Sequence, residues 1–435
     1  MSGASDNERV EAEKKRRDGY ARRMMQRARE LRESDAFAPP ERNPQEAEVV
    51  TAAEAIAEAS EERRSSRRWV VFFAIVCAAI AAFSLCLPYY GIDNMGASGS
   101  MYSPADVLAC YKLWFQMNVL PLFDSSLSNR AGRMLSEFDY SHPGVTYSLV
   151  MNRVAVTLIT IACGMLLALA GLLFQAAFRN PLAAPTSLGV SDGVTLGCVI
   201  YLMLGNVSIA ENPTLYLLLS YGCGAASVAI VLLLSRVLSG RSTYNVIDML
   251  LLGTVLCQLL SGVSGFVQNF VMTDTQWDNF YDIQQASNAL VEPLVQKVFV
   301  IVFLCTFIPA FVLRFKLNLI SFSDEEGTMM GVRAGLLRGL ALVLGSAMEL
   351  AAIASIGQVA MLSLAVPFLV RYMMPADFKS QFLGNCLVGC AVLLACMAIQ
   401  QFATIGIVTM PVGTIVSIFI IPFFVWMVAF GKGRW

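Results

Sequence analysis

The stretch GVSDG, residues 189–193, has the G-x-S-x-G spacing of a hydrolase nucleophile elbow. A serine nucleophile of this type needs a histidine base downstream of it. The single histidine, His142, lies upstream, and the hydropathy pattern predicts that it lies on the opposite face of a membrane. We therefore interpret the stretch as structural: Gly189, Gly193 and Gly197 recur at every fourth position and let a helix approach its neighbour closely.

Other patterns that carry covalent chemistry are missing from the sequence. No GxxxxGK[ST] segment occurs, so ATP chemistry must belong to a partner protein. The single histidine excludes a multi-histidine metal site, and the 11 cysteines form no CxxC pair. We expect no catalytic residue, no cofactor and no metal site, and nucleic acid is not an expected partner because there is no basic folded domain.

One carboxylate, Glu349, lies well inside a strongly apolar segment. Such a group is costly in lipid and usually faces a bundle interior or an aqueous path. This position leaves two hypotheses. Glu349 lines or gates a substrate pathway, or it pairs with a serine or glutamine of a neighbouring helix.

The segment FRNPLAAP, residues 178–185, ends an apolar run. Pro181 and Pro185 lack backbone donors and force a turn. Arg179 is either an anchor at the inner membrane face or a contact to a partner protein. Gln175, one turn earlier, makes a polar patch that a bundle interior or a partner could use.

The composition places these residues in an integral membrane protein. Of 435 residues, 56% are hydrophobic and 14% are charged, and the mean hydropathy is +0.61. Segments of about 20 apolar residues, the length that crosses about 30 Å of hydrocarbon, recur along the chain. They predict an all-α, polytopic membrane protein with about ten spans, near residues 69–88, 152–175, 190–208, 213–236, 246–270, 294–313, 338–356, 359–373, 381–402 and 411–430.

Polar segments set the expected domain organisation. Residues 1–68 have matched acids and bases without a sustained apolar stripe, so we expect a cytoplasmic, partly disordered tail, with a basic amphipathic helix on anionic lipid as the alternative. Residues 69–431 form the membrane domain. Basic residues in alternate loops predict that both termini are cytoplasmic in the cell membrane. Two outer segments, 89–150 and 271–293, are long enough to have structure.

The stretch LALAGLLFQAAFRNPLAAPTSLGVSDGVTLG, residues 167–197, resembles the signature of the FecCD/BtuC-type permeases, the membrane subunits of ATP-driven importers for iron-siderophore, haem and cobalamin. Further stretches over residues 250–424 resemble this family in order and spacing, and the resemblance covers about 69–431. Phe368 departs from it, because the family usually has histidine there. The matching signature residues are Gln175, Arg179, Asn180, Pro181, Pro185, Gly189, Pro367, Arg371, Pro411 and Gly413.

The resemblance implies a BtuC-like permease that itself performs no covalent chemistry. Two copies would form the pathway, an extracytoplasmic binding protein would deliver a metal chelate, and two ABC ATP-binding subunits would dock inside on residues 321–333. The alternative is a secondary transporter driven by an ion gradient, which predicts paired intramembrane charges and internal repeats; no convincing repeat is evident in the sequence. The expected ATPase-coupling residues are Ser323, Asp324, Glu325, Met329, Gly331 and Val332.

Overall fold

The computed structural model describes eleven stretches of the chain: residues 68–85, 105, 108–113, 147–205, 208–239, 246–284, 292–317, 334–359, 361–374, 378–402 and 410–430. Nearly all of the expected tail, most of 89–150 and His142 lie outside the described residues. The expected coupling segment also lies outside them, with Ser323, Asp324, Glu325, Met329, Gly331 and Val332. From Val70 onward, the described residues belong to one compact unit, Val70–Trp435.

The prediction of an all-α polytopic membrane protein is confirmed. Every regular element within the described residues is a helix. Seven of these helices are long and apolar enough to cross a membrane, and three further apolar helices are shorter. A helix lies at each of the ten expected spans, but the helices at 190–208, 359–373 and 411–430 are shorter than a full span. The first of them, Arg68–Leu85, packs on a later helix, where the Cys77 thiol donates to the Leu387 carbonyl at 3.0 Å.

Helices of unequal length follow one another in the same order twice. A long helix comes first, then a short one, then two longer ones. The first series is α5 (Tyr147–Phe178), α6 (Val190–Met203), α7 (Pro213–Ser239) and α8 (Val246–Phe270), with the 3-10 helix η3 (Pro185–Leu188) before α6. The second series is α12 (Ala334–Ile356), α13 (Leu362–Met373), α14 (Phe378–Phe402) and α15 (Val412–Phe430). We call these series the first half and the second half.

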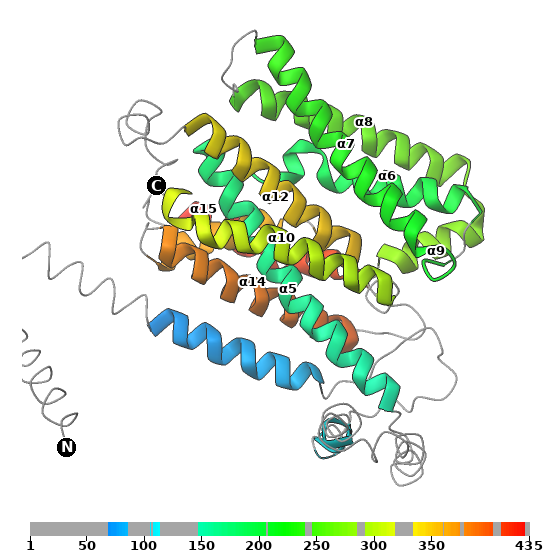
Figure 1. The fold of residues 1–435 in the computed structure, drawn as a ribbon, viewed down its shortest axis with the longest axis vertical. Coiled ribbons are helices and arrows are strands. Elements are labelled where there is room, and N and C mark those ends of the chain that lie inside the picture. Colours follow the sequence, from blue (N-terminus) through cyan, green and yellow to red (C-terminus); the bar gives the residue numbers. More distant parts are fainter. Residues whose placement is uncertain are drawn as a thin grey trace, which may run out of the picture. The chain divides into compact units, whose positions relative to one another are not determined.

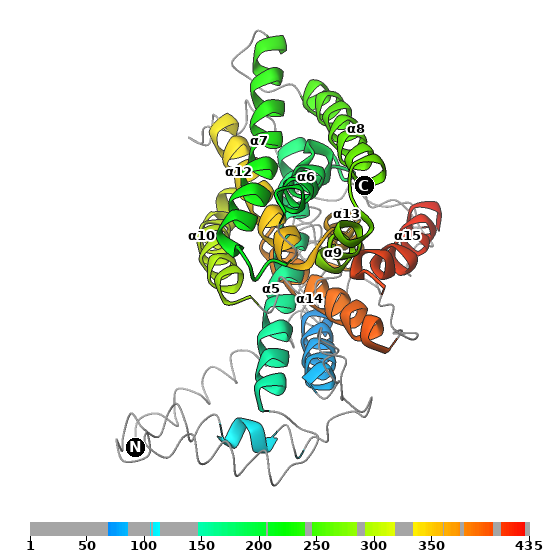
Figure 2. The same cartoon turned by 90° about the vertical axis from the view of Figure 1, so that its right-hand side faces the viewer.

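Two further helices connect the halves. The short amphipathic helix α9 (Asp274–Gln284) follows α8, and it buries Phe280 and Ile283 while Asp274, Asp278 and Asp282 are exposed. The long apolar helix α10 (Pro293–Leu317) comes next and packs on α12 and α14. Figures 1 and 2 show both connecting helices. In its described part, the expected outer segment at 271–293 thus contains a short turn at 271–273 followed by helix α9.

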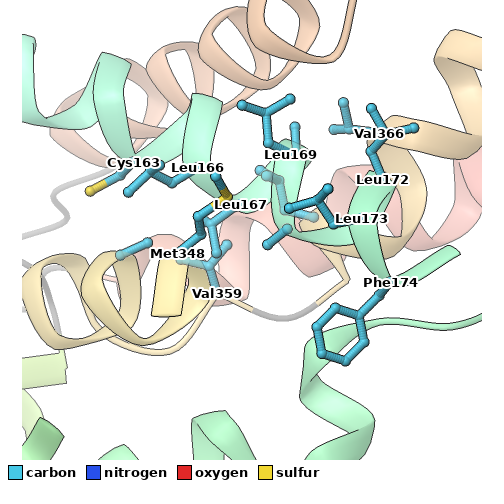
Figure 3. Close-up of a cluster of buried hydrophobic side chains, with 14 of the residues drawn as sticks. Cys163, Leu166, Leu167, Leu169, Leu172, Leu173, Phe174, Met348, Val359 and Val366 are labelled. Carbon is cyan, nitrogen blue, oxygen red and sulfur yellow. The ribbon is translucent and has the colours of Figure 1, made fainter. Parts of the chain in front are cut away.

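The core is built around α5, which packs against α12, α13 and α14 (Figures 1 and 2). From Leu166 to Phe178 its buried side chains are leucine, alanine and phenylalanine apart from Gln175, so this part of the helix is apolar around almost its whole circumference, as expected of a helix enclosed by others. Figure 3 shows Leu166, Leu169 and Phe174 of this helix among side chains of α12 and α13. Gly164 of α5 and Gly389 of α14 bring the two backbones into direct contact.

The glycines at every fourth position have two different roles. A Cβ on Gly193 would lie 2.8 Å from the Cys223 carbonyl oxygen of α7, and a Cβ on Gly197 would overlap Leu219 of the same helix. The predicted close packing is therefore found at these two positions. For Gly189 the interpretation is wrong: this residue precedes the helix, its surroundings leave room for a Cβ, and its φ of 76° is the feature that requires glycine.

Candidate functional site

The signature stretch folds into a sharp turn after α5. Arg179 has a φ of 50°, in the left-handed region, and the turn closes with hydrogen bonds from its N–H to the Ala176 carbonyl at 3.3 Å and from the Asn180 N–H to the Gln175 carbonyl at 3.2 Å. This is the Schellman pattern that ends helices, with arginine where glycine is usual. The Asn180 side chain then accepts from the Leu182 N–H at 2.9 Å. The helix thus stops before it reaches Pro181.

The rest of the stretch forms the 3-10 helix η3 and the glycine that precede α6. Pro185 opens the 3-10 helix η3, where its missing donor costs nothing, and Gly189 ends that helix with a hydrogen bond from its N–H to the Thr186 carbonyl at 3.0 Å. Helix α8 packs directly on this turn, because Gly253 brings the α8 backbone against the Ser187 carbonyl. The turn is therefore supported by a neighbouring helix as well as by its own backbone bonds.

Gln175 connects this region to the second half. Its side chain is 1% exposed, and Nε2 donates to the Leu364 carbonyl in the first turn of α13 at 3.2 Å. One turn earlier on α5, Gly171 lies against the Ser363 carbonyl and Pro367 of the same short helix, so no larger residue fits there. Of the two uses predicted for Gln175, the structure shows the bundle interior.

The remaining signature residues lie on α13 and at the start of α15. Pro367 is buried inside α13, and Arg371 is half-buried in its last turn. Phe368, at the position where histidine was expected, packs edge-on against Phe424 of α15, with ring centroids 5.1 Å apart. This apolar contact links α13 to α15 without a titratable group.

Pro411 and Gly413 form a second contact region, apart from the α5 turn. The Pro411 carbonyl accepts from the Thr414 N–H at 3.0 Å as α15 begins. Gly413 brings this first turn against the Gln358 carbonyl, in the segment between α12 and α13. The same segment reaches α9, because the Gln358 N–H donates to the Gln284 side chain at 3.0 Å. The signature residues therefore lie in two regions: the turn after α5 together with α13, and the start of α15.

Glu349 lies on α12 with 0% of its surface exposed. Its Oε1 accepts a hydrogen bond from the Ser191 hydroxyl of α6 at 3.4 Å, while Oε2 has no hydrogen-bond partner. Ser191 is the serine of the G-x-S-x-G stretch, and its hydroxyl contacts a buried carboxyl. The sequence singled out both residues but gave no signal that they meet, because they are 158 positions apart.

Helix α8 has polar side chains on its exposed surface, which the sequence analysis did not single out. Its exposed surface carries Thr254, Gln258, Ser261 and Asn269 among apolar residues such as Leu259 and Phe266. The Ser261 hydroxyl donates to Asp192 of α6 at 2.6 Å. Gly262 faces open space on the same side, since nothing lies within 4 Å of a Cβ placed there. A count of polar residues along α8 would have found this feature.

The exposed surface of α10 is different. Its exposed residues in the middle of the helix are apolar, and they include Val300, Ile301, Leu304 and Ile308. A surface of this kind suits contact with lipid, whereas the polar positions of α8 do not. The two exposed helices therefore differ in what they are suited to contact.

Metal chemistry has no support in the described part of the chain, where no three His, Cys, Asp and Glu side chains gather so that they could hold an ion. The polar groups that do meet are amides, hydroxyls and two carboxyls, Glu349 and Asp192, the second of which accepts from the Ser261 hydroxyl of α8 at 2.6 Å. Such an arrangement can hold helices in register or line a path.

Comparisons with known proteins agree with the resemblance seen in the sequence. The profile of the FecCD transport family matches residues 120–430. A probable iron chelatin transport system permease protein from Helicobacter pylori is 30% identical over 291 residues, which cover 65% of this chain and 82% of the relative. The hemin transport system permease protein HmuU from Yersinia pestis is 29% identical over 282 residues, 63% of this chain and 81% of that protein.

A solved structure has the same fold. It shows an inward-facing conformation of a metal-chelate type ABC transporter, and it is similar with a TM-score of 0.62 and 19% identity over 84% of this chain and 99% of that one. The ten apolar helices, the signature turn after α5 and the profile match over most of the membrane-spanning region lead to one conclusion. The chain belongs to the FecCD transport family of ABC transporter permeases.

Proposed function

We propose that this chain is the membrane-spanning subunit of an ATP-driven importer for a metal chelate of the iron-siderophore, haem or cobalamin type. The family match over residues 120–430 is the observation that carries this proposal. The relatives named for iron chelatin and hemin transport support the substrate class. The chain performs no covalent step of its own, and ATP hydrolysis belongs to a separate ATP-binding subunit.

The translocation pathway forms between two copies of the chain, with α8 at the contact. The polar and glycine positions on the exposed side of α8 support this arrangement, because polar side chains in lipid are costly and small residues let helices approach closely. The apolar exposed side of α10 suits lipid instead. A homodimer therefore buries the polar surface of α8 and leaves the apolar surface of α10 in contact with lipid.

The other partners follow from the expected topology. Both termini and the segment 321–333 are cytoplasmic, and two ABC ATP-binding subunits dock on Ser323, Asp324, Glu325, Met329, Gly331 and Val332. An extracytoplasmic binding protein delivers the chelate on the opposite side, near α9. ATP binding must favour one conformation of the permease over the other, since a partner that bound both equally would shift nothing.

The charged tail is a solvated extension that this assembly does not need. Its low apolar content gives it little surface to bury against a partner. Deleting residues 1–60 should therefore leave the amount of ATP-binding subunit that copurifies with the chain unchanged. Loss of that subunit on deletion would show that the tail is part of the docking surface.

A secondary transporter driven by an ion gradient is the competing function, and the buried Glu349 together with the repeated helix order favours it. Copurification separates the two. The tagged chain is expressed with an ATP-binding subunit and a binding protein encoded beside it. We expect the ATP-binding subunit to copurify in equal number, and its ATP hydrolysis to rise when loaded binding protein is added; a chain that purifies alone and leaves hydrolysis unchanged contradicts the proposal.

A further inference from the structure

The two short helices α6 and α13 begin in the same way. They have 14 and 12 residues, so they extend about 21 and 18 Å and cover only part of a hydrocarbon layer of about 30 Å. Each follows a residue in the left-handed region, Gly189 with a φ of 76° and Met361 with a φ of 68°. For methionine this conformation is strained, and it persists where the surrounding structure holds it.

Each long buried helix reaches the first turn of the short helix in the other half. From α5, Gln175 donates to the Leu364 carbonyl of α13. From α12, Glu349 accepts from the Ser191 hydroxyl of α6. The two halves are therefore connected crosswise through polar side chains, and both connections end at the start of a short helix.

These side chains form a buried group that we call the central polar cluster, with Gln175, Ser191, Glu349 and Ser363 as its members. All four are at most 3% exposed. The Ser363 hydroxyl of α13 lies near the same carboxyl, that of Glu349, whose Oε2 has no hydrogen-bond partner. Ser191 and Ser363 occupy the same place, the second residue of their helices. One carboxyl thus lies beside the starts of both short helices.

Two oxygen atoms explain why a carboxyl suits this position. The first N–H groups of a helix and the serine hydroxyls near them are donors that need acceptors. A carboxyl between two helix starts offers an oxygen to each, whereas an amide of the same size offers one oxygen and an NH₂ donor group. The first half uses an amide, Gln175, for its own connection, and that amide bonds a single carbonyl.

We propose that Glu349 is a positioning residue of the transport cycle. Its buried carboxyl holds the start of α6 to α12 through Ser191 and lies beside the start of α13, so that the short helices of the two halves shift together when the permease changes conformation. This inference rests on the proposed function. It differs from a pathway-lining role, because the carboxyl acts on helices and contacts no substrate.

The test uses the full complex of chain, ATP-binding subunit and binding protein in lipid vesicles, with haem and a ferric chelate as separate probes. Glu349→Gln keeps the size of the side chain and replaces one oxygen with an NH₂ donor group. We expect the maximal rate of ATP hydrolysis stimulated by the binding protein to fall about fivefold or more, while the binding-protein concentration for half-maximal stimulation changes by less than about twofold. Ser191→Ala should cause a smaller decrease. Ser355→Ala is the matched control, since this buried serine of α12 bonds the Ala351 carbonyl of its own helix.

Hydrogen–deuterium exchange of the purified chain is a second measurement, of backbone amide exchange rates, and it does not require transport activity. In Glu349→Gln the first turns of α6 and α13 should exchange about tenfold faster, while α14 keeps its rate. An unchanged maximal rate together with unchanged exchange in both short helices would overturn the inference, and so would faster exchange spread evenly over α14. If the wild-type complex hydrolyses no ATP, the proposed function fails, and the exchange experiment still decides whether Glu349 holds the two helices.

Discussion

The two halves of the chain have the same order of helices, but different residues precede their short helices and different side chains connect each half to the other. The first half turns into its short helix with Gly189, and its long helix crosses over through the amide of Gln175. The second half turns with Met361 and crosses over through the carboxyl of Glu349. The halves therefore differ in where a strained residue lies: the first half has the left-handed Arg179 in the turn after α5, and the second half has Met361 directly before its short helix. Only the connection from the second half uses a carboxyl.

The largest effect is expected where the halves touch most closely. Gly171→Ala places a methyl group into the Ser363 carbonyl, so α5 and α13 must separate. We expect destabilisation of more than about 3 kcal/mol and loss of monodisperse protein in gel filtration. Gly222→Ala on α7, where nothing lies within 4 Å, is the control and should behave as wild type. Normal yield of Gly171→Ala would mean that the halves are not in contact here.

Much of this fold could be predicted from the sequence because hydrophobic length is a strong signal. The positions of the ten apolar helices and the turn at Pro181 and Pro185 follow from apolar runs and missing backbone donors. The contact between Ser191 and Glu349 could not be predicted, because pairing across 158 positions leaves no local pattern.

Local rules also misled in two places. The spacing of Gly189 indicated helix packing, yet the structure uses this glycine for its left-handed backbone. The left-handed backbone conformation of Met361 could not be predicted from the sequence, since methionine rarely adopts it and no neighbouring residue indicates a turn of this kind.

The second prediction concerns the surface where two copies of the first half are expected to meet. Gly262→Leu adds bulk to the open side of α8, away from the core of its own chain. We expect the chain to fold and insert normally but to form few dimers, with uptake reduced about tenfold or more. Native mass spectrometry in detergent measures the dimer. Ile308→Leu on the exposed side of α10 is the control, and equal loss of dimer in both variants would contradict a contact through α8.

The third prediction compares the two left-handed turns directly. Gly189→Ala adds a Cβ at a φ of 76° and should destabilise the chain by about 1–2 kcal/mol. Met361→Gly relieves strain at a φ of 68°, while glycine adds freedom to the unfolded chain, so its stability should stay within about 1 kcal/mol of wild type. Thermal unfolding of the purified variants measures both. Equal destabilisation would show that backbone strain does not distinguish the halves.

The smallest effect is expected at the amide of the first half. Gln175→Leu removes one hydrogen bond to the Leu364 carbonyl and should destabilise by about 1 kcal/mol. Stimulated ATP hydrolysis should fall less than in Glu349→Gln, because the Gln175 amide bonds a single carbonyl of α13, whereas the Glu349 carboxyl lies beside the starts of both short helices. A larger decrease at Gln175 than at Glu349 would reverse the assignment of roles to the halves.

The most direct test of the account is uptake of a ferric chelate or haem into vesicles that hold the complete complex, with ATP inside or omitted and with or without a proton ionophore. The account predicts uptake that requires hydrolysable ATP and continues when the ionophore removes the proton gradient. Uptake that stops with the ionophore and proceeds without ATP would contradict it, and would make this chain a transporter driven by an ion gradient.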